Sequence, residues 1–400
     1  MKAGKSQIGV GCVDITDREK QYVNEVLESG RLSYGPFLKK FESGFAAAHQ
    51  SKHAIMVSSG TSALEMAVAC LKETGPWKDN DEILCPAVTF VATANVVLQN
   101  GLEPVFVDVD PRTYNIDPKK IEASITSKTR AIMVVHLFGQ PADMSPIMAI
   151  ADKHNLRVIE DSCETMFASY KNKLVGSFGD ISCFSTYAAH LIVSGVGGLL
   201  LTNSTEYAEI LRSLANHGRD NIYISIDDDK MADAEKRREV ISRRYNFIRR
   251  GYSYRVTEME GALALGQLER KDDIINTRRK NAARLVAGLA PFESHLQLPW
   301  HPECAEHSFM MFPIVIREDS SIKRDDLVNY LEEHNIETRG MLPIINQPFY
   351  VERYGNLEDR FPVARWINQN GFYIGCHQKI TNDELEYVIS TFSAFFTSRQ

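Results

Sequence analysis

Short apolar or β-branched stretches alternate with longer amphipathic stretches over the first half of the chain. In the amphipathic stretches, such as 61–74, 90–100 and 144–154, apolar residues recur every three or four positions, which predicts helices that bury one face. The short apolar stretches predict buried strands. Seven such strands are predicted, at residues 54–58, 82–85, 104–107, 131–135, 157–159, 182–184 and 198–202.

This alternation of strand and helix predicts an α/β fold with a mostly parallel sheet covered by helices on both faces. Sheets of this kind bind ligands at the carboxyl ends of their strands. After residue 251 the strand signals become sparse, and a second αβ pattern follows that ends in an amphipathic helix at 383–399. We therefore expect a large domain at residues 1–279, which includes the N-terminal segment, and a smaller C-terminal α/β domain at 280–400.

Composition narrows the class of protein. A chain of 400 residues is longer than one hydrophobic core usually serves, and its 44% hydrophobic and 24% charged residues are typical of a globular protein. No apolar run approaches the roughly 18–20 residues of a membrane helix. Residues 1–16 have no apolar signal-peptide core, so we expect a cytoplasmic protein. The seven cysteines are scattered without a CxxC pair, which predicts free thiols and no metal site.

Charge argues against one class of partner. The net charge of −7 is unlike that of a general nucleic-acid binder, which carries a basic excess. One local exception is the segment 236–250, where seven lysines and arginines follow the acidic residues 227–229. This segment is either a solvated stretch whose charges offset each other or a wall of arginines for a diphosphate, and the sequence leaves both interpretations open.

The tripeptide Ser59, Gly60 and Thr61 ends one predicted strand and opens a helix. A helix N-terminus offers unpaired N–H groups and a partial positive charge, and glycine lets a phosphate approach the backbone closely. Serine and threonine at such a junction are also ordinary helix caps. On this motif alone, a phosphate site and a simple cap are both open.

Two carboxylates follow a later buried strand. The position of Asp161 and Glu164 beside a buried strand requires an explanation, because carboxylates are seldom buried without partners. One reason is a cationic heterocycle, since an aspartate facing a pyridine nitrogen keeps it protonated and makes the ring an electron sink. The alternative is that they cap the next segment or accept a backbone N–H. Downstream, His190 and the glycines of 195–198 would, taken singly, be a structural histidine and turns.

Together these motifs resemble the DegT/DnrJ/EryC1/StrS sugar aminotransferases, which have the fold of aspartate aminotransferase, type I of the pyridoxal-phosphate enzymes. The resemblance implies a mostly parallel seven-stranded sheet, a smaller C-terminal α/β domain and a homodimer whose active sites are shared between subunits. It is strong from about residue 35 to 267 and looser beyond. In chain order it rests on Ser59-Gly60-Thr61, residues 86–90, residues 135–140, Glu160-Asp161 and Phe184-Ser185 with the double glycine that follows.

The resemblance also implies a cofactor site for pyridoxal 5′-phosphate. Gly60, Thr61 and Ser185 would hold its phosphate, Phe90 would stack on its pyridine ring and Asp161 would pair with the ring nitrogen. The full set implied to bind the cofactor is Ser59, Gly60, Thr61, Phe90, Asp161, Glu164, Ser185 and Ser253.

Two members of that set differ from the usual family residue. Glu164 stands where family members commonly have a glutamine near the cofactor's 3-hydroxyl. In the family dimer an asparagine from the neighbouring subunit reaches the phosphate, and here the corresponding loop, 251–255, carries Ser253. Ser253 would do the same job with a shorter reach.

The decisive departure is His190, which stands where family aminotransferases carry the lysine that forms a Schiff base with the cofactor. No lysine occurs between Phe184 and Asn203. An imidazole cannot form that bond, so pyridoxal or pyridoxamine phosphate would be held noncovalently. Histidine titrates near pH 6.5 and lysine near 10.4, so His190 is the better-matched base at neutral pH.

Family members with a histidine here are dehydratases of 3,6-dideoxysugar biosynthesis. The resemblance therefore implies a nucleotide-sugar 3-dehydratase, with His190 as base and L-glutamate as amino donor, acting on a 4-keto-6-deoxyhexose such as GDP-4-keto-6-deoxy-D-mannose. The relatives that act on CDP-sugars add a cysteine-ligated iron–sulfur cluster, which the cysteine spacing here does not favour. Phe90 replaces a tryptophan of the GDP-type enzymes, so the sugar stays open. The rivals are a 4-aminotransferase with another base and a catalytically silent sugar-binding homologue.

Overall fold

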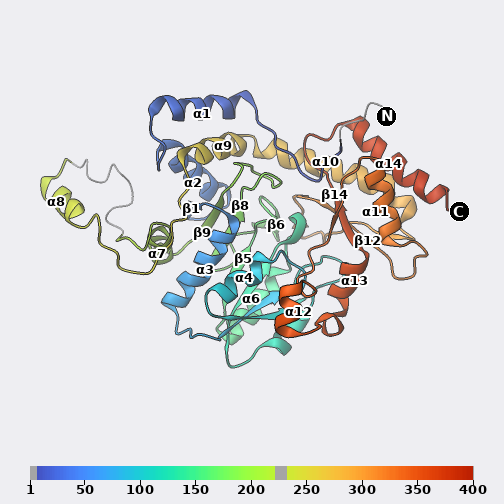
Figure 1. Cartoon of the computed structure of the whole chain (residues 1–400), viewed down its shortest axis with the longest axis horizontal. Helices are drawn as coiled ribbons and strands as arrows, with labels where there is room; N and C mark the ends of the chain where they lie inside the picture. The colour runs from blue at the N-terminus through green and yellow to red at the C-terminus, as the bar shows by residue number, and fades with distance from the viewer. Residues whose placement is uncertain (1–6, 221–231, 400) are drawn as a thin grey trace.

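The computed structural model describes residues 7–220 and 232–399, and a seven-stranded sheet forms its centre (Figure 1). The strand order is β1-β9-β8-β5-β4-β2-β3, and β9 alone of these runs antiparallel to the others. The expected α/β fold is confirmed, and each predicted strand corresponds to one strand of this sheet. They are β1 (His53–Val57), β2 (Glu82–Pro86), β3 (Glu103–Val107), β4 (Thr129–Val135), β5 (Arg157–Asp161), β8 (Ile181–Ser185) and β9 (Gly198–Thr202).

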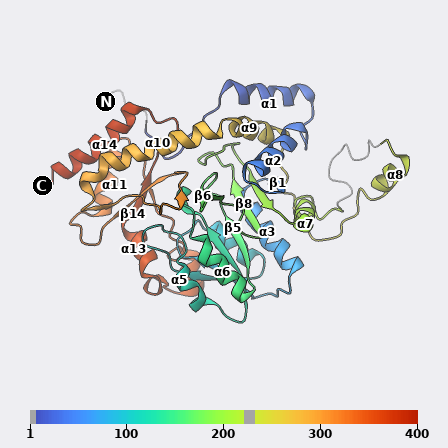
Figure 2. The same cartoon turned by 180° about the vertical axis from the view of Figure 1, so that it is seen from behind.

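Helices cover both faces of the sheet. The helices α3 (Gly60–Thr74) and α4 (Ala92–Gln99) lie in front of it in Figure 1, and α6 (Met144–His154) lies in front of it in the reverse view of Figure 2. Side chains of successive strand residues enter separate cores on the two faces, since Ile83 packs with the α3 side and Leu84 with the α6 side. The remaining helices on this part of the chain are α1 (Asp17–Ser29), α2 (Pro36–Ala48), α7 (Thr205–Ala215) and α9 (Glu258–Glu269).

A second, antiparallel sheet lies in the C-terminal part of the chain. Its order is β10-β12-β14-β13, and a separate apolar core forms between it and helices α10, α11 and α14. The predicted domain boundary at 279/280 falls inside α10, and the division into domains stays a prediction. The elements are α10 (Lys271–Leu289), β10 (Leu296–Gln297), β12 (Phe312–Ile316), α11 (Arg324–Glu333), β13 (Arg339–Gly340), α12 (Pro348–Tyr354), α13 (Pro362–Asn370), β14 (Gly371–Ile374) and α14 (Asn382–Thr397).

Residues 8–11, here called the N-terminal strap, lie against the C-terminal part of the chain. Ile8 pairs with Ile336, and the Val10 N–H donates to Glu337 Oε2 over 2.7 Å. On the other side the strap touches the loop that precedes His190, because a Cβ on Gly11 would lie 3.0 Å from Ala189 Cα. The strap therefore bridges that loop and the second sheet.

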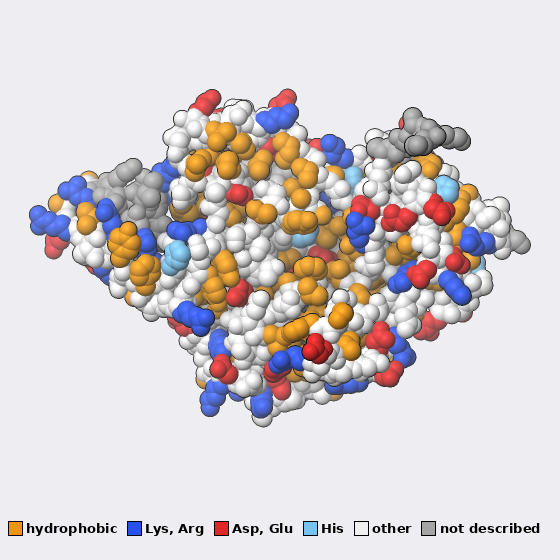
Figure 3. All heavy atoms as spheres, in the orientation of Figure 1, with side chains coloured by type: hydrophobic (Ala, Val, Ile, Leu, Met, Phe, Trp, Pro, Cys, Tyr) orange, Lys and Arg blue, Asp and Glu red, His pale blue; other side chains and the backbone are white. Residues whose placement is uncertain are grey.

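Helix α8 (Ala234–Ser242) projects from the body of the molecule (Figure 1). Lysine and arginine side chains gather on this projection (Figure 3). Two of the arginines that follow are paired with carboxylates, Arg243 with Asp220 and Glu239, and Arg249 with Glu73. The acidic residues 227–229 lie outside the described residues. Among the helices of the described ranges, none combines the length and apolar character that a bilayer span requires.

Candidate active site

A cavity of about 390 Å³ opens at the carboxyl ends of three parallel strands. Val135 ends β4, Asp161 ends β5 and Ser185 ends β8, and all three line the cavity. Parallel sheets place their ligands at this edge. Eight of the nine residues predicted from the sequence line it together: Ser59, Gly60, Thr61, Phe90, Asp161, Glu164, Ser185 and His190.

The N-terminus of α3 forms a cradle on one wall of the cavity. The Ser62 N–H donates to Ser59 Oγ over 3.0 Å, so Ser59 caps the helix as well as lining the cavity. A Cβ on Gly60 would lie 2.7 Å from Cys163 Sγ and 2.9 Å from Ser185 Cβ, so only glycine fits there without displacing them. The helix N-terminus and the nearby hydroxyls suit a phosphate group.

Asp161 is buried at the end of β5. Its carboxylate accepts Thr93 Oγ1–H over 2.8 Å and the Cys163 N–H over 3.2 Å. Burial raises the pKa of Asp161 and these hydrogen bonds oppose the rise. No lysine or arginine in the described ranges forms an ion pair with Asp161, so a protonated ring nitrogen would be a stabilising partner.

Glu164 holds its proton at neutral pH. Burial raises the pKa of Glu164 to about 8, the hydrogen bond from the Phe138 N–H opposes the rise, and the nearby Asp161 adds to it. The Phe138 nitrogen lies 3.1 Å from Glu164 Oε2. A protonated carboxyl can donate a hydrogen bond into the cavity, which a glutamine would do through its amide.

His190 has its ring fixed by its own loop. Nδ1 lies 3.2 Å from the Ser185 carbonyl oxygen, and since that oxygen can only accept, Nδ1 carries the proton and Nε2 keeps its lone pair. Burial lowers the pKa of His190 to about 4, the hydrogen bond to Ser185 opposes the shift, and the Arg278 guanidinium adds to it. The imidazole is therefore neutral and its Nε2 lone pair is available, but a pKa of about 4 does not bear out the expected match to neutral pH, because burial makes His190 a weaker base than an ordinary histidine.

Comparison with known proteins places this geometry in a family. The model of the DegT/DnrJ/EryC1/StrS aminotransferase family matches residues 13–393. The chain belongs to this family. DegT-family members depend on pyridoxal phosphate, which is the cofactor that the cradle, Asp161 and the cavity fit.

Similar DegT-family proteins have different activities. The lipopolysaccharide biosynthesis protein RfbH of Salmonella typhimurium is 35% identical over 98% of this chain and 93% of its own length. The crystal structure of Escherichia coli GDP-4-keto-6-deoxy-D-mannose-3-dehydratase with bound hydrated PLP matches with a TM-score of 0.87 and 28% identity, covering 97% of this chain and 100% of that one. An aminotransferase from Psychrobacter cryohalolentis matches equally well, with a TM-score of 0.88 and 29% identity, covering 96% and 98%.

The remaining predicted DegT-family residue, Ser253, lies outside the cavity. It is exposed, and its Oγ accepts a hydrogen bond from Arg255 over 3.2 Å. The loop itself is anchored to the start of the α3 motif, because the Ser58 N–H donates to the Tyr254 carbonyl over 2.8 Å. A contact of Ser253 with the phosphate of a neighbouring subunit stays a prediction.

The sequence did not single out several residues that line the cavity. Cys163 lies on its floor and Tyr187 stands against His190, with ring centroids 5.8 Å apart at 78°. Met310, Met311 and Tyr373 reach it from the second sheet and the chain that precedes it. Tyr187 and Cys163 could have been found from their places near His190 and Asp161, whereas Met310, Met311 and Tyr373 are distant in sequence.

Glu160 precedes Asp161 in one of the motifs on which the family resemblance rests, and its role is structural. Its buried carboxylate accepts the N–H groups of Gly176 and Gly179, each over 2.7 Å, and His136 Nε2 lies 3.0 Å away. Burial opposes ionisation, but these hydrogen bonds outweigh it and lower the pKa of Glu160. Glu160 therefore fixes the glycine-containing turn that leads into β8.

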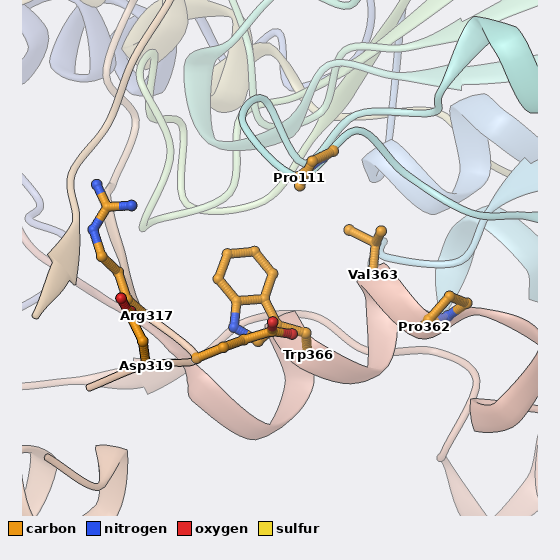
Figure 4. A pocket seen from close by; sticks show the side chains of 7 residues that line it. Pro111, Arg317, Asp319, Pro362, Val363 and Trp366 are labelled. Carbon is orange, nitrogen blue, oxygen red and sulfur yellow. The ribbon is translucent and has the colours of Figure 1, made fainter. Parts of the chain in front are cut away.

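A second hollow lies elsewhere on the molecule and contains none of the predicted residues. Figure 4 shows Arg317 and Asp319 on one side of it, Pro111 above, and the side chains of Pro362, Val363 and Trp366 from α13. It is open to solvent and lacks the cradle and the acid–base groups of the first cavity. The candidate active site is thus the cavity at the strand ends.

Proposed function

We propose that this chain is a nucleotide-sugar 3-dehydratase, which removes the C3 hydroxyl of a 4-keto-6-deoxyhexose. Its substrate would be GDP-4-keto-6-deoxy-D-mannose, its amino donor L-glutamate, and its product a precursor of a 3,6-dideoxysugar such as colitose in a surface polysaccharide. The observation that supports it most is the neutral imidazole of His190 at the position of the family lysine. Two further structures of 3-dehydratases, with bound GDP-perosamine and with a trapped PLP-glutamate geminal diamine, resemble this chain at 28% identity.

The residues of the cavity divide the task of holding the cofactor. Gly60, Thr61 and Ser185 would receive the phosphate, and Asp161 the ring nitrogen. Phe90 presents an exposed ring at the mouth, with 55% of its surface accessible, and would stack on the cofactor. When bound, the cofactor supplies an electron sink. No lysine lines the cavity within the described ranges, which supports noncovalent binding.

His190 and Glu164 supply the proton chemistry. Nε2 of His190 would accept the proton whose removal lets the C3 hydroxyl leave, and could return it to the departing oxygen as water. Glu164, protonated at neutral pH, would donate a hydrogen bond to the cofactor's 3-hydroxyl oxygen. The apolar side chains of Met310, Met311 and Leu342 line the same cavity and limit the water in it.

The direct test is product analysis. The purified protein would be incubated with pyridoxal phosphate, L-glutamate and GDP-4-keto-6-deoxymannose, and the sugar product analysed by mass spectrometry and NMR. We expect a 4-keto-3,6-dideoxysugar and free ammonia. An amino sugar that keeps C3 oxygen and gains nitrogen would show a 4-aminotransferase, and no turnover with substrate bound would support a silent homologue.

The His190→Lys variant tests the site itself. We expect 3-dehydration to fall on the order of 10²-fold or more, as for loss of a positioned base. Borohydride should fix pyridoxal phosphate covalently in this variant and not in the wild type. Covalent fixation in the wild type would reveal another lysine as tether and overturn the assignment.

A further inference from the structure

Arg278 on helix α10 is a buried cation with no carboxylate partner. Its side chain is 0% exposed, and within the described part of the chain it forms no ion pair and its Nε has no hydrogen-bond partner. Arginine is almost never fully buried unless it is paired, because removing the charge from water costs free energy. The hydrogen bonds of the guanidinium show what the burial of this charge achieves.

The guanidinium joins two walls of the cavity. It donates to the carbonyl oxygens of Met310 over 2.9 Å, Phe309 over 3.3 Å and His190 over 3.4 Å. Met310 and His190 both line the cavity, although they are distant in the chain. Arg278 therefore ties the His190 loop to the chain that enters the second sheet.

The same contacts lead on to Glu164. The Met310 N–H donates to the Phe138 carbonyl over 3.0 Å, and the Phe138 N–H donates to Glu164 Oε2 over 3.1 Å. A continuous series of hydrogen bonds thus runs from the Arg278 guanidinium through the backbone groups of Met310 and Phe138 to Glu164. It sets the position of the His190 loop relative to Glu164.

Arg278 also acts on His190 through its charge. The titratable groups that share the cavity are Tyr187 from the same loop, Asp161, Cys163 and Glu164 from the end of β5, and Tyr373 from β14. No lysine or arginine lines the cavity in the described ranges, but Arg278 contacts the His190 loop from behind the cavity wall. A positive charge beside an imidazole disfavours its protonated form.

We propose that Arg278 is a positioning residue for the acid–base pair of this site: it fixes the His190 loop against the Met310 wall. Its charge adds to the burial that disfavours the protonated imidazole. This inference rests on the proposed role of His190 as base. Arg278 touches neither cofactor nor substrate, and it acts through the loop that it holds.

The test uses His190 titration in the protein without added cofactor or substrate. The histidines are labelled with ¹³C at Cε1, and the His190 signal is assigned as the one that disappears in His190→Gln. In Arg278→Met we expect the titration midpoint to rise by about one pH unit, the size of effect that one nearby charge produces. Arg278→Lys keeps the charge and should shift it less.

The matched control is Arg284→Met, which removes an arginine from the same helix at a site paired with Glu386 on the surface. It should leave the His190 midpoint unchanged. Equal midpoints in Arg278→Met and the wild type would overturn the inference. If the Arg278 variants do not fold, the wild type can still contradict the inference, because a His190 midpoint at or above 6.5 would overturn it as well.

Turnover supplies the second readout. With 3-dehydration as the assay, kcat of Arg278→Met should fall on the order of 10²-fold while KM changes by less than about threefold, since a displaced base affects the reaction more than binding. A fall in kcat/KM caused by KM alone would overturn the positioning role. The NMR titration does not depend on activity. If the protein proves not to be a 3-dehydratase, the titration result for Arg278 and His190 therefore still holds, and the two failures can be told apart.

Discussion

Glu164 and His190 have pKa values that burial moves in opposite directions. The pKa of Glu164 rises to about 8 and that of His190 falls to about 4. In an unfolded chain the order is reversed, with glutamate near 4.5 and histidine near 6.5. At neutral pH the carboxyl therefore holds a proton and the imidazole has none, which is the arrangement that an acid and a base in one site need.

The raised pKa of Glu164 predicts how stability depends on pH. In the unfolded chain Glu164 loses its proton near pH 4.5, whereas in the folded protein it keeps the proton up to about pH 8. Its contribution to stability is thus present at low pH and lost as pH rises through this window. The free energy of unfolding can be measured with urea on the cofactor-free protein at pH 5.5, 7 and 8.5. Between the lowest and the highest of these pH values, the wild type should lose more of this free energy than Glu164→Gln does, by on the order of a few kcal/mol.

The control for this prediction is Glu303→Gln, which neutralises an exposed glutamate. It should follow the wild-type pH dependence. If Glu164→Gln also follows the wild type between pH 5.5 and 8.5, Glu164 is ionised in the folded protein and cannot donate a proton in the cavity.

Some residues of the site could be found from the sequence and others could not. Asp161 and His190 stand in motifs whose order along the chain predicted a shared site, and both line one cavity. Arg278 gave no such signal, because a lone arginine in an amphipathic helix is usually solvated. Met310 and Tyr373 join the cavity only through packing of the second sheet. Neither pKa shift could be predicted, since both depend on burial in the folded chain.

At the scale of elements, the N-terminus of α3 predicts a requirement for glycine. A Cβ at position 60 would crowd Cys163 and Ser185 and occupy the cradle. Overpacking of this kind costs about 1–3 kcal/mol, so Gly60→Ala should weaken binding of pyridoxal phosphate roughly tenfold or more. Absorbance titration of the cofactor-free protein measures this affinity.

Gly340→Ala is the matched control for Gly60→Ala. A Cβ at Gly340 on β13 would meet no atom within 4 Å. It should bind pyridoxal phosphate as the wild type does. Wild-type affinity in Gly60→Ala itself would place the phosphate elsewhere.

The strands of the large sheet were predictable because buried parallel strands are short, continuous apolar runs. Their spatial order was not, since it depends on pairing between distant segments. Helices α1 and α2 were not predicted either. For α1 a signal was present: Thr16 and Glu19 form a capping box at its start. The helix itself is mostly polar and buries only a narrow face, so its apolar period is weak.

For the whole molecule, the exposed position of Ser253 gives a test of the shared active site. Within one chain Ser253 lies outside the cavity and contacts Arg255. If a second subunit carries it to the phosphate, Ser253→Asp would place two negative charges together and weaken pyridoxal phosphate binding at least about tenfold. The wild type and this variant should both sediment as dimers, at roughly twice 45.1 kDa.

Ser390→Asp on the exposed side of α14 is the control, because it adds the same charge far from the cavity. It should bind the cofactor normally. A dimeric Ser253→Asp variant with unchanged affinity for pyridoxal phosphate would remove Ser253 from the site.

The N-terminal strap has a consequence for biosynthesis of the protein. Residues 8–11 leave the ribosome more than 300 residues before Glu337 and Gly375, which they contact. The loop that carries His190 rests against this strap, so that loop gains its full support only once residues 337 and 375 have emerged. The large sheet can form on the emerging chain, but the strap can pack against the second sheet only after residues 337 and 375 have been synthesised.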